Sequence, residues 1–191
     1  MILKFWARSF LIAALFGVAM PVFAAEITSP AKQAHITDFA TGKILFSKDA
    51  DAPMKPASMA KIMTVFVAFQ RIADGQLGMD DKFTISEKAW KKGGSRTFLE
   101  VGKTVSVREL LHGIIVQSGN DAAIVLAEGI SGPENAFADE MNFWAKKIGM
   151  KNTNFRNSTG WPDPDLTTTA ADLNIMTTEL IRRFPADKYP D

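Results

Sequence analysis

The sequence contains no cysteine and only two histidines, His35 and His112. The absence of cysteine excludes thiol nucleophiles, thiolate metal sites and disulfide bonds in one step. The two histidines are far apart in the chain, so they do not indicate a metal centre. Each is interpreted as an ordinary residue, His35 in a strand and His112 on the surface of a helix. We therefore expect neither a metal nor any other cofactor.

An excess of charge of one sign is also missing. The 191 residues hold 22 basic and 21 acidic side chains, which gives a net charge of +1. This balance indicates no binding surface for a polyanion, so a nucleic-acid partner is not expected. The hydrophobic content of 47% is ordinary for a globular chain with a real core, and the length suits about one domain.

The N-terminal stretch has the pattern of an export signal. Two basic residues precede a mostly apolar run over residues 9–20, and a cleavage-like site follows that ends at Ala24. The apolar run is short for a membrane span. We predict a secretory signal peptide at residues 1–24 and a mature chain at residues 25–191, located in the periplasm or at the face of the inner membrane, with no membrane anchor in this chain.

The hydrophobic periodicity predicts an α+β fold, with strands first and helices after them. Short apolar runs on either side of Thr41-Gly42 indicate a β-hairpin, and a short third strand follows. The expected strands are residues 34–38, 43–47 and 82–85. The expected helices are residues 56 to about 73–78, 107–117, 121–130, 133–148 and 170–184. Asn120 or Asp121 is the expected cap of the third helix, and apolar stripes that include Ile115 and Ile181 are expected to face the core.

The helix that follows Pro56 carries one residue that does not fit a buried helix. It is apolar almost all round, yet Lys61 is the only ionisable residue between Ser58 and Gln70. Burial would lower the pKa of this lysine, and Ser58 lies three residues earlier on the same helical face. A weak nucleophile beside a tunable base is the arrangement that covalent catalysis needs. The alternative is a capping serine followed by a lysine whose amine extends to solvent.

A second candidate site lies at Ser118-Gly119-Asn120, a tight turn between two strongly apolar helices. Short polar residues held between buried helices are well placed for catalysis, although a plain cap and turn would satisfy the same pattern. The segment 91–96, which contains three basic residues, indicates either a solvated flexible loop or a rim that attracts a substrate carboxylate. Asp163 and Asp165 are interpreted as turn formers, because prolines surround them.

Ser58-x-x-Lys61 followed by Ser118-Gly119-Asn120 resembles the signature of penicillin-binding proteins. More specifically, the sequence resembles the serine D-alanyl-D-alanine carboxypeptidases, which are low-molecular-weight penicillin-binding proteins of peptidase family S11. The resemblance covers nearly the whole mature chain. It is closest at Thr41-Gly42-Lys43, at residues 56–64 and 113–122, at Met150-Lys151-Asn152-Thr153 and at Gly160-Trp161-Pro162-Asp163.

This resemblance implies a role for each candidate residue. Ser58 would attack the bond between the terminal D-alanines of a peptidoglycan pentapeptide, and Lys61 would take its proton. Ser118 would relay a proton to the leaving D-alanine, and Asn120 would hold the substrate amide. β-Lactams would acylate Ser58 and act as inhibitors.

The third motif of that family, Lys-Thr-Gly, is absent, and Lys103-Thr104-Val105 is interpreted as a coincidence. We therefore expect a truncated carboxypeptidase domain of the β-lactamase and penicillin-binding-protein type. Its helical half would be present and its sheet reduced to the N-terminal hairpin, so that helices expose apolar area. Such a chain would acylate poorly or not at all. A catalytically dead fragment or a non-catalytic cell-wall-binding module stays open as an alternative. A β-lactamase fits less well, because it would favour aspartate at position 119.

Overall fold

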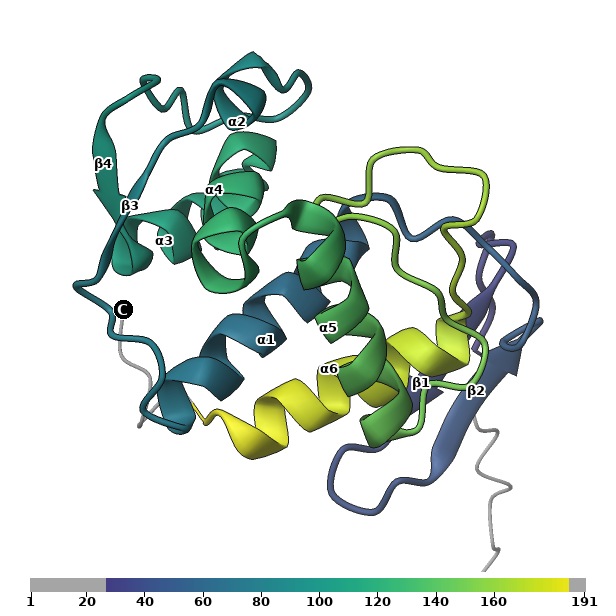
Figure 1. Ribbon diagram of the computed structural model, residues 1–191. Helices are drawn as coiled ribbons and strands as arrows, with labels where there is room; N and C mark the ends of the chain where they lie inside the picture. Colours follow the sequence, from purple (N-terminus) through teal and green to yellow (C-terminus); the bar gives the residue numbers. More distant parts are fainter. Residues whose placement is uncertain (1–26, 186–191) are drawn as a thin grey trace, which may run out of the picture.

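The computed structural model describes residues 27–185 (Figure 1). The predicted signal peptide, residues 1–24, lies outside the described residues. Four strands and six helices follow one another in this part of the chain: β1 Ala34–Thr37, β2 Ile44–Lys48, α1 Ala60–Ala73, β3 Lys82–Thr84, α2 Glu87–Lys91, β4 Thr104–Ser106, α3 Val107–Gln117, α4 Asn120–Ser131, α5 Glu134–Ile148 and α6 Ala170–Arg183. Within residues 27–185 no helix combines the length and apolarity needed to cross a bilayer.

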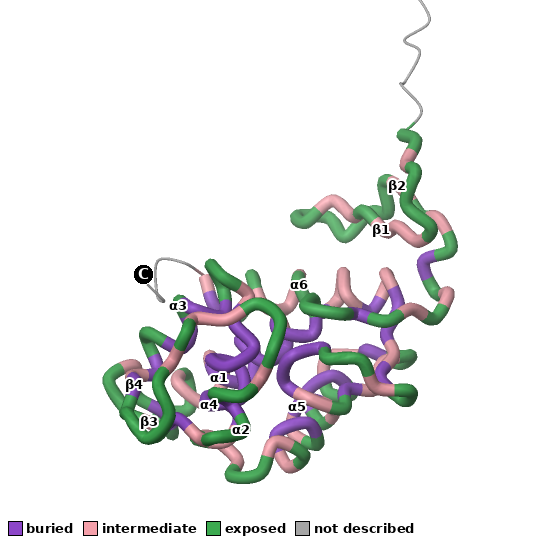
Figure 2. The backbone as a smooth tube through the Cα atoms, turned by 90° about the horizontal axis from the view of Figure 1, so that it is seen from above, coloured by how far each residue is buried: buried purple, intermediate pink, exposed green. Residues whose placement is uncertain are grey.

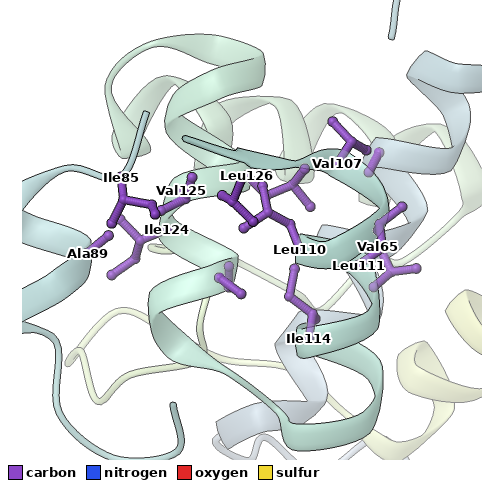
Figure 3. Close-up of a cluster of buried hydrophobic side chains, with 14 of the residues drawn as sticks. Val65, Ile85, Ala89, Val107, Leu110, Leu111, Ile114, Ile124, Val125 and Leu126 are labelled. Carbon is purple, nitrogen blue, oxygen red and sulfur yellow. The ribbon is translucent and has the colours of Figure 1, made fainter. Parts of the chain in front are cut away.

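The central element is α1, which lies between the α3–α4 pair and the helices α5 and α6 (Figure 1). It is buried on opposite faces because it is apolar almost all round, as predicted. Val65 and Ala68 belong to a cluster built mainly by α3 and α4 (Figure 3). Met63 and Phe66 belong to a second cluster built by α5, α6 and the segment between them. The middle of α1 is therefore held from both sides.

The strands form two separate antiparallel pairs. In the predicted hairpin, β1 pairs with β2 and His35 faces Ser47. This hairpin lies beside α6, and most of its residues are exposed or half-buried (Figure 2). The α+β prediction is confirmed. A second pair was not foreseen: β3 pairs with β4, so Lys103-Thr104-Val105 leads into a strand and Phe83 faces Val105.

Side-chain caps fix where several helices begin. The Ser106 hydroxyl accepts a hydrogen bond from the Glu109 backbone N–H, and the Glu109 carboxylate accepts one from the Ser106 backbone N–H. The two bonds form a capping box at the start of α3. Thr169 caps α6 by accepting from the Asp172 N–H. The predicted cap of α4 was wrong, because α4 begins after Gly119 without a side-chain cap.

Two residues expected in the core lie at the surface instead. The exposed fraction is 61% for Ile115 and 50% for Ile181. Each comes one position after a residue on the buried or half-buried face of its helix. One position is a rotation of about 100°, which turns the side chain away from that face. On α6 that face includes Met176, Leu180 and Phe184. Large apolar side chains are also exposed on the hairpin, at Ile36, Ile44 and Leu45.

Candidate active site

Ser58 lies in a 3-10 turn, Ala57–Met59, directly before α1. Its side chain is exposed, while Ala60 and Lys61 are buried. Ala57 has a positive φ of 48°, a conformation that costs a non-glycine residue energy. The predicted helix around Ser58 is confirmed, but its first turn is tighter than an α-helix.

Lys61 is buried one turn further on, with 4% of its surface exposed. Its amine Nζ lies 3.3 Å from Ser58 Oγ and donates to the backbone carbonyl of Thr159 at 2.9 Å. Burial disfavours the ammonium form and lowers the pKa of Lys61 to about 8. The alternative in which the amine extends into solvent is therefore wrong. The arrangement places an amine that is neutral in part near pH 8 next to an accessible hydroxyl.

Ser118 belongs to the same cleft as Ser58 and Lys61 although it is 60 residues away from Ser58 in the sequence. It ends α3 in the left-handed conformation, with φ 54°. The cleft has a volume of about 360 Å³, and its remaining walls are mostly apolar. Ile62, Val65, Phe69, Ile114, Ile115 and Leu180 form these walls. The exposure of Ile115, which the helical pattern did not predict, places it at this cleft.

Asn120 is placed differently from the other three candidates. It is 6% exposed, and its Nδ2 donates to the Gly93 carbonyl at 2.8 Å. Its backbone N–H donates to the Ser95 carbonyl, which ties the start of α4 to the loop that follows α2. In the described part of the chain, Asn120 is not among the residues that line the cleft. Its assignment to substrate binding stays a prediction.

Asp121, next to it, is the residue that holds this loop, although the sequence pattern predicts no role for it beyond a possible cap. Its fully buried carboxylate accepts from the N–H groups of Thr97 and Leu99 and from the Thr97 hydroxyl. Arg96 Nε lies 4.0 Å from it. A buried, multiply bonded carboxylate could not be recognised from the sequence, because Asp is common at helix starts for capping alone.

The segment 91–96 contains three basic residues, and each of them has a partner within the protein. Lys91 pairs with Glu87, Lys92 Nζ lies 3.9 Å from the centre of the Trp161 ring, and Arg96 donates to the Trp90 carbonyl. Four of the six residues are exposed, as expected of a solvated loop, while the side chains of Lys92 and Arg96 contact other parts of the protein. Attraction of a substrate carboxylate by this segment stays a prediction.

The fold is the one found in the penicillin-binding class of proteins. The family model for D-alanyl-D-alanine carboxypeptidase (Peptidase S11) matches residues 20–189. The chain belongs to this family.

Named relatives agree with that assignment. DacF of Bacillus subtilis is 42% identical over 164 residues, which is 86% of this chain and 42% of DacF. DacC of Escherichia coli is 38% identical over 184 residues, 91% of this chain and 46% of DacC. Both are D-alanyl-D-alanine carboxypeptidases.

Solved structures show the same fold, that of penicillin-binding proteins and related transpeptidases. DacD of Francisella tularensis superposes with a TM-score of 0.82 at 43% identity, over 84% of this chain and 39% of that one. Penicillin-binding protein 5 of Haemophilus influenzae superposes with a TM-score of 0.80 at 37% identity, over 84% of this chain and 48% of that one. The chain spans less than half the length of these four proteins.

Proposed function

We propose that the protein is a serine-type D-Ala-D-Ala carboxypeptidase that removes the terminal D-alanine from peptidoglycan stem pentapeptides in the periplasm. The observation that carries this proposal is the position of the buried Lys61 amine, 3.3 Å from the exposed Ser58 hydroxyl. The family assignment, the homologous carboxypeptidases and the shared fold support it.

In this mechanism Ser58 Oγ attacks the carbonyl carbon between the two terminal D-alanines while neutral Lys61 accepts its proton. The backbone N–H of Ser58 supplies one donor for the oxyanion. Ser118 passes a proton to the departing D-alanine amine, and Asn120 holds the substrate amide. Water then hydrolyses the acyl ester and frees Ser58. Burial supports this role for Lys61, because a lysine with a pKa of about 8 is partly neutral near neutral pH.

β-Lactams are proposed as inhibitors that acylate the same hydroxyl. Penicillin-binding protein D2 of Listeria monocytogenes, 29% identical to this chain, has been solved in an ampicillin-bound form. A β-lactam in this protein would enter the cleft between α1 and Ser118 and stay attached to Ser58.

The test is covalent labelling with a fluorescent penicillin, together with release of D-alanine from a stem pentapeptide. Stoichiometric labelling of the wild type, none of Ser58→Ala, and D-alanine release support the proposal and overturn the expectation that a chain without Lys-Thr-Gly acylates poorly. The absence of both labelling and release from folded protein contradicts it and favours a non-catalytic cell-wall-binding module. Rapid turnover of penicillin without a lasting adduct would instead identify a β-lactamase.

A further inference from the structure

The turn at residues 157–161 is organised by one side chain, that of Asn157. Its Oδ1 accepts bonds from the backbone N–H groups of Thr159, Gly160 and Trp161 at 3.2, 2.8 and 3.0 Å. It also accepts from the Thr159 hydroxyl at 3.0 Å, and its Nδ2 donates to the Trp161 carbonyl at 3.0 Å. Asn commonly stabilises turns in this way, but here a single oxygen serves three successive peptide groups.

Two of these peptide groups are held by α1 at their other ends. The Gly160 N–H and the Thr159 carbonyl belong to one planar peptide unit. Asn157 binds its N–H, and Lys61 Nζ donates to its oxygen at 2.9 Å. The preceding unit repeats the pattern, since Asn157 binds the Thr159 N–H and Thr64 Oγ1 donates to the Ser158 carbonyl at 2.7 Å. The turn is therefore clamped between Asn157 and α1.

Neighbouring elements hold the turn from other sides. The carboxylate of Glu134, at the start of α5, accepts from the N–H and the hydroxyl of Ser158 at 3.1 and 2.7 Å. Gly160 lies so close to the 3-10 turn before α1 that a Cβ atom there would be 1.7 Å from the Ala57 carbonyl oxygen. Small movements of the turn are consequently transmitted to the residues on both sides of Ser58.

We propose that Asn157 is a positioning residue for Lys61: by fixing the N–H end of the Thr159–Gly160 peptide, it places the carbonyl that orients the Lys61 amine toward Ser58. The hydrogen bonds described above are sufficient to infer that Asn157 positions Lys61. The expected effect of this positioning on acylation rests on the proposed function. Asn157 itself does not contact Lys61 in the described hydrogen bonds, so it acts through the turn.

Loss of this acceptor should change the environment of Lys61. Without Asn157 three N–H groups lose a shared partner, the turn loosens and water reaches the amine. Burial is the cause of the low pKa of Lys61, so hydration should raise this pKa from about 8 toward its ordinary value of 10.5. The charged groups on the surrounding elements have partners or are exposed. Glu134 pairs with Lys88, Arg156 with Asp163 and Glu179 with Arg183. Lys55 donates to three carbonyls of residues 163–166, and His112 is exposed.

The experiment compares the pH dependence of Ser58 acylation by a fluorescent penicillin in the full chain and in Asn157→Ala. Acylation of the wild type is expected to rise with pH through a midpoint near that of Lys61. In the variant the midpoint should move upward, and each unit of that shift lowers the neutral fraction of Lys61 at pH 7 about tenfold. The rate should therefore fall at pH 7 and recover in part toward pH 10. Asn157→Ser keeps a neutral but weaker acceptor and should lie between the two.

Asn154→Ala is the matched control, because Asn154 makes the same kind of bond, from Nδ2 to the Asp165 carbonyl, in the same segment. It should leave the midpoint unchanged. A midpoint that is unchanged in Asn157→Ala and Asn157→Ser overturns the proposal, even if the rates fall. Loss of the folded state in both variants also overturns it, since Asn157 would then serve folding alone.

A second measurement separates this proposal from the proposed function. NMR titration of protein with 13C-labelled lysine, in which Lys61→Arg identifies the Lys61 signal, reports the pKa without any acylation. If the wild type is not acylated, the proposed function fails while this titration still decides the role of Asn157. An upward shift in Asn157→Ala supports positioning, and an unchanged value contradicts it.

Discussion

Gly160 packs directly against the backbone of Ala57, although 103 residues separate them in the chain. Gly160 has φ 77°, and a Cβ atom at this position would lie 1.7 Å from the Ala57 carbonyl oxygen. Only glycine satisfies both conditions, the left-handed backbone and the close approach. This contact joins the turn at residues 157–161 to the residue that precedes Ser58.

Replacing Gly160 by alanine should therefore damage both stability and the site. We expect a loss of about 3 kcal/mol or more in the free energy of unfolding, because the backbone at residue 160 and the backbone of Ala57 would have to move apart. Displacement of Ser58 by about 1 Å should lower the acylation rate roughly a hundredfold. Urea denaturation and penicillin labelling measure the two effects.

Gly102→Ala is the control for the backbone conformation alone. Gly102 has φ 78° and no atom within 4 Å of its added Cβ. This variant should lose only about 1–2 kcal/mol and should acylate normally. Equal stability losses in the two variants would contradict the importance of the Ala57 contact.

The low pKa of Lys61 predicts a pH-dependent stability. Between about pH 8 and 10.5 the unfolded chain binds a proton at Lys61 that the folded chain does not, so the free energy of unfolding rises with pH in this window. Below pH 8 Lys61 is charged in the folded state as well, and its burial lowers the free energy of unfolding. The shift of the pKa from 10.5 to about 8 corresponds to a penalty on the order of 3 kcal/mol, at about 1.36 kcal/mol per pKa unit.

Lys61→Met keeps an unbranched side chain of nearly the same length and removes the titration. Urea denaturation at pH 7 and pH 10 measures the free energy of unfolding of the variant minus that of the wild type. This difference should be largest at pH 7 and should decline as the pH approaches 10. Other titrating groups cancel in this difference. A difference that is independent of pH would show that Lys61 titrates normally.

Asp121→Asn should be strongly destabilising. It places an amide donor among the N–H and hydroxyl donors that the buried carboxylate now satisfies, so at least one of them loses its acceptor. We expect a loss of about 3 kcal/mol in the free energy of unfolding. In Asp80→Asn, where the side chain is almost fully exposed, the change should stay within about 0.5 kcal/mol. Similar losses at the two positions would contradict the role of Asp121 in holding residues 97–99.

Ser118 should show opposite effects on stability and activity. Its φ of 54° is strained for serine, so Ser118→Gly should gain up to about 1 kcal/mol while it removes the hydroxyl. Ser118→Ala removes the hydroxyl and keeps the strain. Both should acylate slowly, but only the glycine variant should have a raised melting temperature. Normal acylation in Ser118→Ala would exclude Ser118 as the proton relay.

Much of the fold followed from local pattern. The helix that begins next to Ser58, the capping box of Ser106 and Glu109 and the hairpin at Thr41-Gly42 are short-range features, and the structure confirms each of them. The second strand pair was missed because β3 and β4 have three residues each, too few for a periodic signal. The exposure of Ile115 was missed because a helical pattern does not specify how wide its buried face is.

The sequence by itself determined the pairing of Ser58 with Lys61, because a spacing of three residues at the start of a helix places two side chains on one face whatever surrounds them. Only the tertiary structure decided that Lys61 is buried, that the Thr159 carbonyl receives its amine and that Ser118 reaches the same cleft. These contacts connect Lys61 with Ser118, which is 57 positions away in the chain, and with Thr159, which is 98 positions away. No local pattern encodes such distances, since they arise from the way α1 packs between two separate cores.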